Sequence, residues 1–288
     1  MHIETKGVKI FKWFNYFILA LLSFICLYPM MYVAFVAFSD PLRYMAHRGP
    51  LLMPLGFSTA SIRSIFQNHL ILNAYRNTLW LLVIGVPFNL FMTLLGAYFL
   101  SRRGLMLFKP IMLLIIFTMY FSGGMIPRFN LIALDLGLMN SRWALILPGA
   151  ISTFNMIILR TAMSSVPASL EESAKIDGAS HFRVLFKIML PLVTPTMAVL
   201  VLFYGVGYWN AWFDARLFVN VRQMMPLQLL LREMLVLNNV EILEVDAEPV
   251  ALTVQYSIII VSTVPILVLY PFLQRYFVKG MMVGAVKG

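Results

Sequence analysis

Residues able to do chemistry are concentrated in one polar segment, 164–195, which reads SSVPASLEESAKIDGASHFRVLFKIMLPLVTP. The Ser-x-x-Glu pattern from Ser169 to Glu172 is typical of a capped helix start. Gly178 suits the left-handed position that ends a helix, and Ser180 is a good cap for the next one. The segment therefore predicts two short amphipathic helices joined at Gly178. Their charges are either solvated at a membrane surface or offered to a partner protein.

A second set of polar side chains lies inside otherwise apolar stretches. Polar groups are expensive in lipid and are often functional there. These side chains would hydrogen-bond the hydroxyls of an uncharged solute. Alternatively, the asparagines bond neighbouring helices and Tyr208 joins an interfacial aromatic belt. The set comprises Asn89, Thr93, Asn155, Tyr204, Tyr208 and Asn210.

The sequence lacks the patterns of common catalytic and metal sites. It contains no G-x-x-x-x-G-K-[ST] phosphate loop. Cys26 is the one cysteine, and the four histidines are scattered rather than set at metal-ligand spacing. No nucleophile, acid and base come together in the pattern. We therefore predict no catalytic residue, no metal site and no cofactor bound by this chain.

The elements that must position these residues are membrane helices. The 288 residues are 61% hydrophobic and 12% charged, whereas soluble domains average about 25% charged residues. A helix that crosses a bilayer needs about 20 apolar residues. The basic residues punctuate apolar runs instead of forming one basic face, which argues against nucleic acid. Six stretches are free of Asp, Glu, Lys and Arg, namely 13–39, 77–101, 110–127, 143–159, 188–213 and 249–274.

Orientation follows from the basic residues beside these stretches. With the N-terminus inside, all eight lysines fall in the inside segments, including the loop 160–187. The reverse orientation would place every lysine outside. The first stretch is too long for the core of a cleaved signal peptide, so it is retained. We predict an all-α, multi-pass protein of the bacterial cytoplasmic (inner) membrane, with both termini cytoplasmic and residues 1–288 forming one transmembrane domain.

The polar segment resembles the EAA loop of binding-protein-dependent ABC importer permeases. That family pattern is Glu-Ala-Ala, three residues, Gly, nine residues, then Ile-x-Leu-Pro. Here it reads Glu172-Ser173-Ala174, Gly178, and Ile188 followed by Leu190-Pro191. Two further segments are similar to the carbohydrate (maltose-type) subgroup. They are Tyr208-Trp209-Asn210 and the ending Arg275 to Gly280 with Gly284 to Gly288.

The resemblance implies a type I importer fold with six transmembrane helices and a cytoplasmic coupling helix. It implies four kinds of partner: a second homologous permease, two cytoplasmic ATPase subunits, an extracytoplasmic solute-binding protein and the lipid bilayer. ATP and magnesium would be bound by the ATPases. The residues expected to contact an ATPase are Glu172, Ser173, Ala174, Asp177, Gly178 and Ala179.

The expected solute is an oligosaccharide or modified sugar. Asn89, Asn155, Tyr204, Tyr208 and Asn210 would form its hydrogen-bonding pathway. The spans hold no fixed charge for a zwitterionic amino acid, but a peptide importer stays an alternative. A secondary transporter is disfavoured because it would normally carry carboxylates within the membrane. Nine arginines in the outside segments either favour an acidic sugar or face lipid headgroups and the binding protein.

Overall fold

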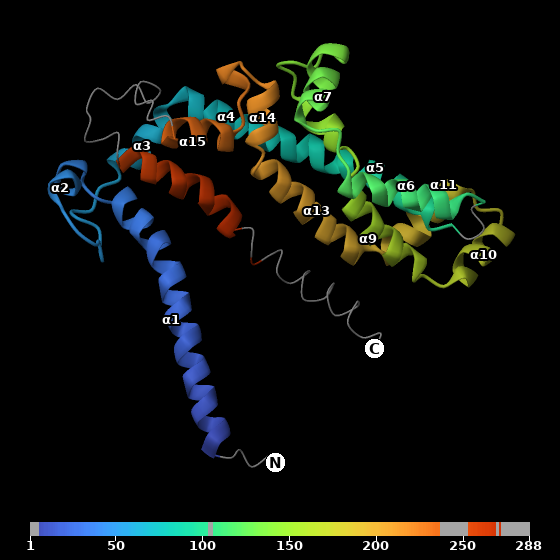
Figure 1. Cartoon of the computed structure of the whole chain (residues 1–288), viewed down its shortest axis with the longest axis horizontal. Helices are drawn as coiled ribbons and strands as arrows, with labels where there is room; N and C mark the ends of the chain where they lie inside the picture. The colour runs from blue at the N-terminus through green and yellow to red at the C-terminus, as the bar shows by residue number, and fades with distance from the viewer. Residues whose placement is uncertain (1–5, 103–105, 237–252, 269–270, 272–288) are drawn as a thin grey trace. The chain divides into compact units, whose positions relative to one another are not determined.

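The computed structural model describes residues 6–102, 106–236, 253–268 and 271 (Figure 1). Most of these residues are helical, and the one isolated pairing of extended chain among them is a bridge between Ser39 and Phe57. The chain forms two compact units. The first combines Met1–His69 with Glu233–Pro265, and the second combines Leu70–Arg232 with Ile266–Gly288.

Among the described residues, two helices are long and apolar enough to cross a membrane without a break, Gly7–Ala37 and His69–Leu100. Up to five spans result if each of three bent helix pairs counts as one. Thr253–Val268 is a shorter apolar helix. The pairs are Phe108–Tyr120 with Met125–Asp135 (bent by 105°), Trp143–Gly149 with Thr153–Ser164 (50°), and His181–Leu192 with Thr194–Trp209 (84°).

Each predicted apolar stretch therefore contains helix, but not always one straight helix. In the stretch 110–127, which was predicted as one span, the first helix ends at Tyr120 and a new one starts at Met125. Gly124 lies between them with φ +90°, a conformation that glycine adopts without strain. The predicted ending after 271, the first five residues and residues 237–252 lie outside the described residues.

The first unit is built on α1 (Lys6–Ala37), which continues through Pro29. Its other helices are α2 (Pro41–Ala46), α3 (Ala60–Gln67) and the helix Thr253–Val268. Ser257 donates a hydrogen bond to the Ala37 carbonyl at 3.2 Å. The Ser61 and Thr253 hydroxyls are 2.8 Å apart. These buried polar contacts join the helix near the C-terminus to α1 and α3.

The second unit contains the remaining helices. A continuous helix is formed by α4 (His69–Trp80), the π-helical turn Leu81–Gly85 and α5 (Val86–Leu100). It packs with α9 and α13, which lie beside α5 (Figure 1). The others are α6 (Phe108–Tyr120), α7 (Met125–Phe129), α8 (Trp143–Ile146), α9 (Thr153–Ser164), α10 (Ala168–Ile176), α11 (His181–Val184), α12 (Leu190–Leu192), α13 (Thr194–Trp209), α14 (Phe213–Phe218) and α15 (Leu227–Val236).

Two hydrophobic clusters form the core of this second unit. One includes Leu81 in the π-helical turn and Val86 at the start of α5, and the other includes Leu94 and Leu100 in the second half of α5. Asn89 and Thr93 lie between them along the helix, and both are buried. Because an unpaired polar group in such a core is costly, these two side chains need partners on neighbouring helices.

Candidate functional site: a polar cavity and a two-helix hook

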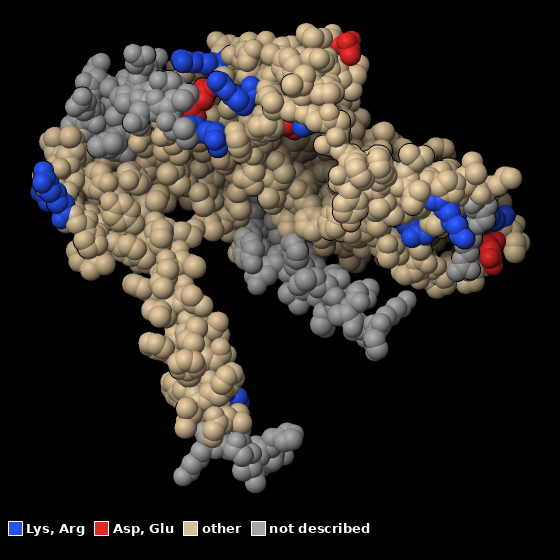
Figure 2. Space-filling model, in the orientation of Figure 1, with Lys and Arg blue, Asp and Glu red and all other residues tan. Residues whose placement is uncertain are grey.

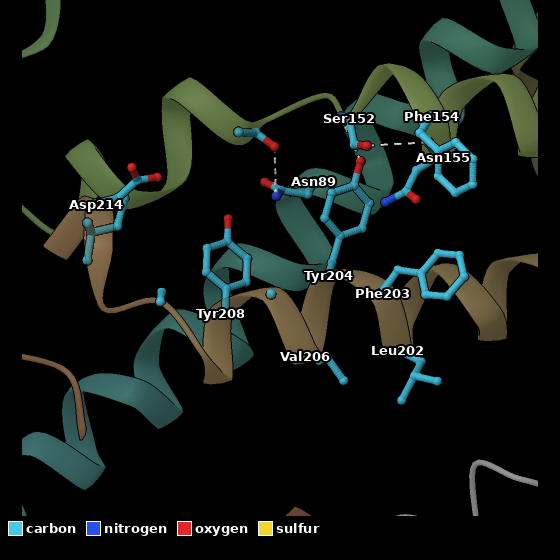
Figure 3. A pocket seen from close by; sticks show the side chains of 14 residues that line it. Asn89, Ser152, Phe154, Asn155, Leu202, Phe203, Tyr204, Val206, Tyr208 and Asp214 are labelled. Carbon is cyan, nitrogen blue, oxygen red and sulfur yellow. Dashed lines mark hydrogen bonds between the residues drawn. The ribbon is translucent and has the colours of Figure 1, made fainter. Parts of the chain in front are cut away.

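A cavity of about 680 Å³ opens between α5, α9 and α13 (Figure 3). This volume is within the range of ligand pockets. α13 presents Tyr204 and Tyr208, which are four residues apart and so lie on one helix face. α5 supplies Asn89, and the start of α9 supplies Asn155. The rings of Phe154 and Phe203, 6.4 Å apart, add an aromatic wall.

The Tyr204 hydroxyl makes two contacts inside the protein. It lies 2.6 Å from the buried Thr93 hydroxyl on α5. It also accepts a hydrogen bond at 3.0 Å from the backbone N–H of Ser152, in the bend that precedes α9. Tyr204 therefore ties α13 to both neighbouring helices at the cavity wall, and a solute would have to displace these bonds to use its hydroxyl.

Asn89 and Tyr208 differ from Tyr204. The Asn89 amide donates to the Gly149 carbonyl at 3.0 Å, which leaves its own oxygen as an acceptor. That oxygen and the Tyr208 hydroxyl are buried neighbours, and neither makes a hydrogen bond of good geometry to any residue that the structure describes. Buried polar atoms are nearly always satisfied, so after a small rearrangement these two atoms would bond either each other or a solute in the cavity, which Asn155 also lines.

Gly85 explains why Tyr208 can pack so closely against the preceding helix. A Cβ at this position would lie 2.7 Å from two ring carbons of Tyr208. That is closer than a carbon–carbon contact allows, so any larger residue must displace the ring. The small residue in the π-helical turn thus sets the position of a cavity side chain.

One charged residue lines the cavity, Asp214 in α14. Arg128 in α7 donates to both of its oxygens, at 2.9 and 2.8 Å. Two parallel bonds of this kind are the preferred geometry for arginine and carboxylate. Because the charge of Asp214 is balanced in this way, the cavity presents no unneutralised carboxylate from the described residues.

The structure thus brings together four of the five residues predicted to form the pathway, and adds Thr93 behind them. Asn210 is not among the lining residues; it is exposed just after α13 ends at Trp209. Sequence reasoning missed Ser152, Phe154 and Asp214. Ser152 alone had a local signal, since serine before a helical run is a typical cap, and its hydroxyl accepts from the Asn155 N–H.

The polar segment forms a hook of two short helices, α10 and α11. Gly178 has φ +76°, as predicted for the residue that ends α10. Its N–H donates to the Lys175 carbonyl, and the N–H of Ala179 donates to the Ala174 carbonyl, which is a Schellman motif. Ser180 caps α11 as predicted by accepting from the Arg183 N–H.

The expected capping box at the start of α10 is wrong. The helix begins at Ala168, one residue before Ser169, and Pro167 precedes it without a side-chain hydrogen bond. Pro167 has no side-chain acceptor for the N–H groups of the first turn, and one of them, the Leu170 N–H, donates to the Pro167 carbonyl at 3.3 Å instead. After the hook, the helix pair His181–Leu192 and Thr194–Trp209 is bent by 84°, next to Pro191 and Pro195, because proline disrupts a helix.

The residues predicted for docking fall on two sides of the hook. Four of them are exposed, Glu172, Ser173, Asp177 and Gly178, whereas Ala174 and Ala179 pack against the core beneath. Apolar side chains are also exposed here, with Ile176 at 86% and Phe182 at 69%. Charged side chains gather over this end of the second unit in Figure 2.

Comparison with known proteins decides the family. The sequence model described as "Binding-protein-dependent transport system inner membrane component" matches residues 80–283. The chain belongs to this family. It is therefore a multi-pass inner-membrane permease, and ATP hydrolysis is the task of partner subunits of such a system.

Similar permeases extend over nearly the whole chain. The polygalacturonan/rhamnogalacturonan transport system permease protein YtcP of Bacillus subtilis (strain 168) is 39% identical over 97% of this chain and 99% of that protein. The maltodextrin transport system permease protein MdxG of the same organism is 27% identical, over 95% of each chain. A solved bacterial ABC transporter involved in the import of the acidic polysaccharide alginate has 30% identity and a TM-score of 0.89, covering 96% of this permease and 100% of that chain.

Proposed function

We propose that this permease is one of two membrane subunits of an ATP-driven importer, and that its solute is an acidic, uronate-containing oligosaccharide. The observation that carries the proposal is the cavity between α5, α9 and α13, which offers hydrogen-bonding groups and aromatic rings but no free carboxylate from the described residues. Relatives that transport polygalacturonan and alginate support the acidic class.

The cavity chemistry suits a sugar. The Asn89 oxygen accepts a hydrogen bond from a solute hydroxyl, and the Tyr208 hydroxyl donates or accepts one. The faces of Phe154 and Phe203 pack against the C–H surfaces of sugar rings. A peptide would bring amide groups and variable side chains, for which four neutral polar residues offer few specific partners.

The carboxylates of such a solute would meet little electrostatic repulsion in the cavity. Asp214 lines the cavity, but both of its oxygens are engaged by Arg128. The nine arginines in the segments assigned to the outside would further favour an anionic chain over a neutral one. Arg128 acts at the cavity through Asp214, whereas the other eight arginines would act on delivery of the solute, because exposed charges interact over only about 8–10 Å at physiological salt.

The hook is proposed as the docking element for a cytoplasmic ATPase. Glu172 and Asp177 are exposed on the hook, as are Ile176 and Phe182, so the hook offers both charged and apolar groups to a partner protein. ATP and magnesium would be bound by the ATPase pair. A second permease and an extracytoplasmic binding protein would complete the importer.

Docking at the hook also sets the proposed topology. Six spans would be made of the two long helices, the three bent pairs and Thr253–Val268, with both termini and the loop 160–187 in the cytoplasm. All eight lysines of the chain then lie on the cytoplasmic side. Both compact units would belong to one permease domain.

The decisive test is ATPase activity of the assembled importer in proteoliposomes, stimulated by its binding protein. Oligogalacturonides, neutral oligosaccharides, peptides and amino acids are compared as solutes. We expect stimulation by oligogalacturonides above all. Stimulation by a peptide and by no carbohydrate would contradict the proposed solute.

The docking role of the hook has its own test. Glu172→Lys is expected to reduce co-purification of the ATPase, and normal docking by this variant would contradict the proposed role of the hook.

A further inference from the structure

The end of α5 and the residues directly after it contact both arms of the hook. Tyr98 donates a hydrogen bond from its hydroxyl to the carbonyl of His181, the first residue of α11, at 3.1 Å. Arg102, four residues further along the chain, forms an ion pair with Glu171 of α10. α5 is therefore attached to α11 through a hydrogen bond from its last turn, and to α10 through a charge pair made by Arg102, two residues beyond its end.

Tyr98 and Arg102 also contact each other. The guanidinium carbon lies 3.6 Å from the centroid of the Tyr98 ring, a cation–π contact. The Arg102 side chain is 16% exposed and that of Glu171 is 21% exposed. Burial lowers the pKa of Arg102, so the Glu171 carboxylate is needed to balance a charge that water solvates poorly. We call Tyr98 and Arg102 the clamp.

The clamp is attached to a rigid element that reaches the cavity. α5 is the end of the unbroken helix His69–Leu100. Asn89 precedes Tyr98 by nine residues, about 14 Å along an α-helix. Thr93, which lies between them, is bonded to Tyr204 at the cavity wall. A displacement of the hook end of α5 would therefore reach cavity residues on two helices.

The covalent path from the hook toward α13 is less direct. After α11 it passes through a π-helical turn and the 84° bend between Leu192 and Thr194. A bent segment absorbs movement by changing its angle, whereas a straight helix moves as a rod. On this side the clamp therefore gives the hook a stiffer connection to the cavity than the covalent path does, while on the other side α9 runs unbroken from Asn155 at the cavity to Ser164, just before the hook.

We propose that the clamp transmits movement of the hook through α5 to Asn89 and Thr93, so that ATP-driven motion of the docked ATPase changes the shape of the cavity. The proposal rests on the importer function given above. Tyr98 and Arg102 act here as positioning residues, because neither lines the cavity.

The chain offers a matched control for the charge pair. Lys175 also contacts Glu171, at 2.9 Å, but it lies on the same helix one turn away. Lys175→Gln removes a charge from the same carboxylate without touching the link to α5. Any effect that arises merely from altering Glu171 should appear in this variant as well.

The experiment measures solute imported per ATP hydrolysed, using the complete importer in proteoliposomes with an oligogalacturonide as the solute. Arg102→Glu and Glu171→Arg should each lower this ratio about fivefold to tenfold, while the ATPase still co-purifies. The double variant R102E/E171R should recover most of the loss, and Lys175→Gln should keep the wild-type ratio. Tyr98→Phe, which keeps the ring and loses the bond to His181, should lower the ratio about twofold to fivefold.

A wild-type ratio in Arg102→Glu, or equal losses in Lys175→Gln and Arg102→Glu, would overturn the proposal. If the charge variants fail to assemble, a wild-type ratio in Tyr98→Phe would overturn it as well. If the wild-type importer moves a peptide and no oligosaccharide, the proposed solute is wrong, and the same variants assayed with that peptide still test the clamp.

Discussion

Tyr204 and Tyr208 lie one helical turn apart on the same cavity wall. Loss of the hydroxyl should nevertheless lower stability at Tyr204 and raise the transport KM at Tyr208. In Tyr204→Phe, the Thr93 hydroxyl and the Ser152 N–H both lose a partner, at 2.6 and 3.0 Å. Leaving a buried donor or acceptor unsatisfied costs about 1–3 kcal/mol, although hydrogen bonds between membrane helices average about 0.6 kcal/mol. We expect a destabilisation of about 1–2 kcal/mol and little change in solute selectivity.

Tyr208→Phe should leave stability nearly unchanged, because its hydroxyl makes no well-formed hydrogen bond within the described residues. Loss of one hydrogen bond to the solute, worth about 0.5–1.5 kcal/mol, should raise the transport KM by about twofold to tenfold. Stability is measured by denaturant-induced unfolding of the purified importer, and KM by uptake into proteoliposomes. Thr93→Val and the double variant T93V/Y204F complete a double-mutant cycle. The losses of stability in the two single variants should not add up in the double variant, because the two hydroxyls contact each other.

The opposite pattern would refute this reasoning. If Tyr204→Phe changed KM with unaltered stability, and Tyr208→Phe destabilised the protein without affecting transport, the assignment of structural and solute-facing hydroxyls would be reversed.

Three further predictions concern topology, the hook and the cavity wall. In a cysteine-free background, Thr59→Cys should be labelled by an impermeant reagent in intact cells and Ser169→Cys should not; the reverse labelling would overturn the orientation. Gly178→Val should cost about 1–2 kcal/mol in the left-handed position and reduce ATPase docking, measured by co-purification, whereas Gly178→Asn should be tolerated; equal docking by both would contradict the role of the turn. Gly85→Val should displace the Tyr208 ring and raise KM at least as much as Tyr208→Phe does; an unchanged KM would show that the ring position is unimportant.

Local patterns in the sequence predicted local structure well. Gly178 and Ser180 adopt the predicted roles because a left-handed turn and an N-cap depend on a few consecutive residues. The capping pattern at Ser169 was misleading, since Pro167 starts the helix without a side-chain acceptor. Each apolar stretch contains a helix, but the stretches do not predict where these helices break. The turn at Gly124 requires a positive φ, and hydropathy carries no information about φ.

Contacts between distant segments could be predicted only in part. Asn89, Thr93 and Tyr204 were singled out because polar groups within apolar helices need partners, and the structure places them around one cavity. The pair of Arg102 and Glu171 was missed. Its members are separated by 68 intervening residues, and a charge at a helix end is ordinarily solvated, so neither residue type nor spacing indicated the contact.

The central claim, that this permease imports acidic oligosaccharides, is tested most directly by a comparison in which only charge differs. Uptake of an oligogalacturonide into ATP-loaded proteoliposomes containing the complete importer is measured against the methyl-esterified oligomer of equal length. Our account predicts ATP-dependent uptake of the acidic chain and much slower uptake of the neutral ester. Equal uptake of both would contradict selection for acidic sugars, and uptake of neither, alongside transport of a peptide, would contradict the oligosaccharide function itself.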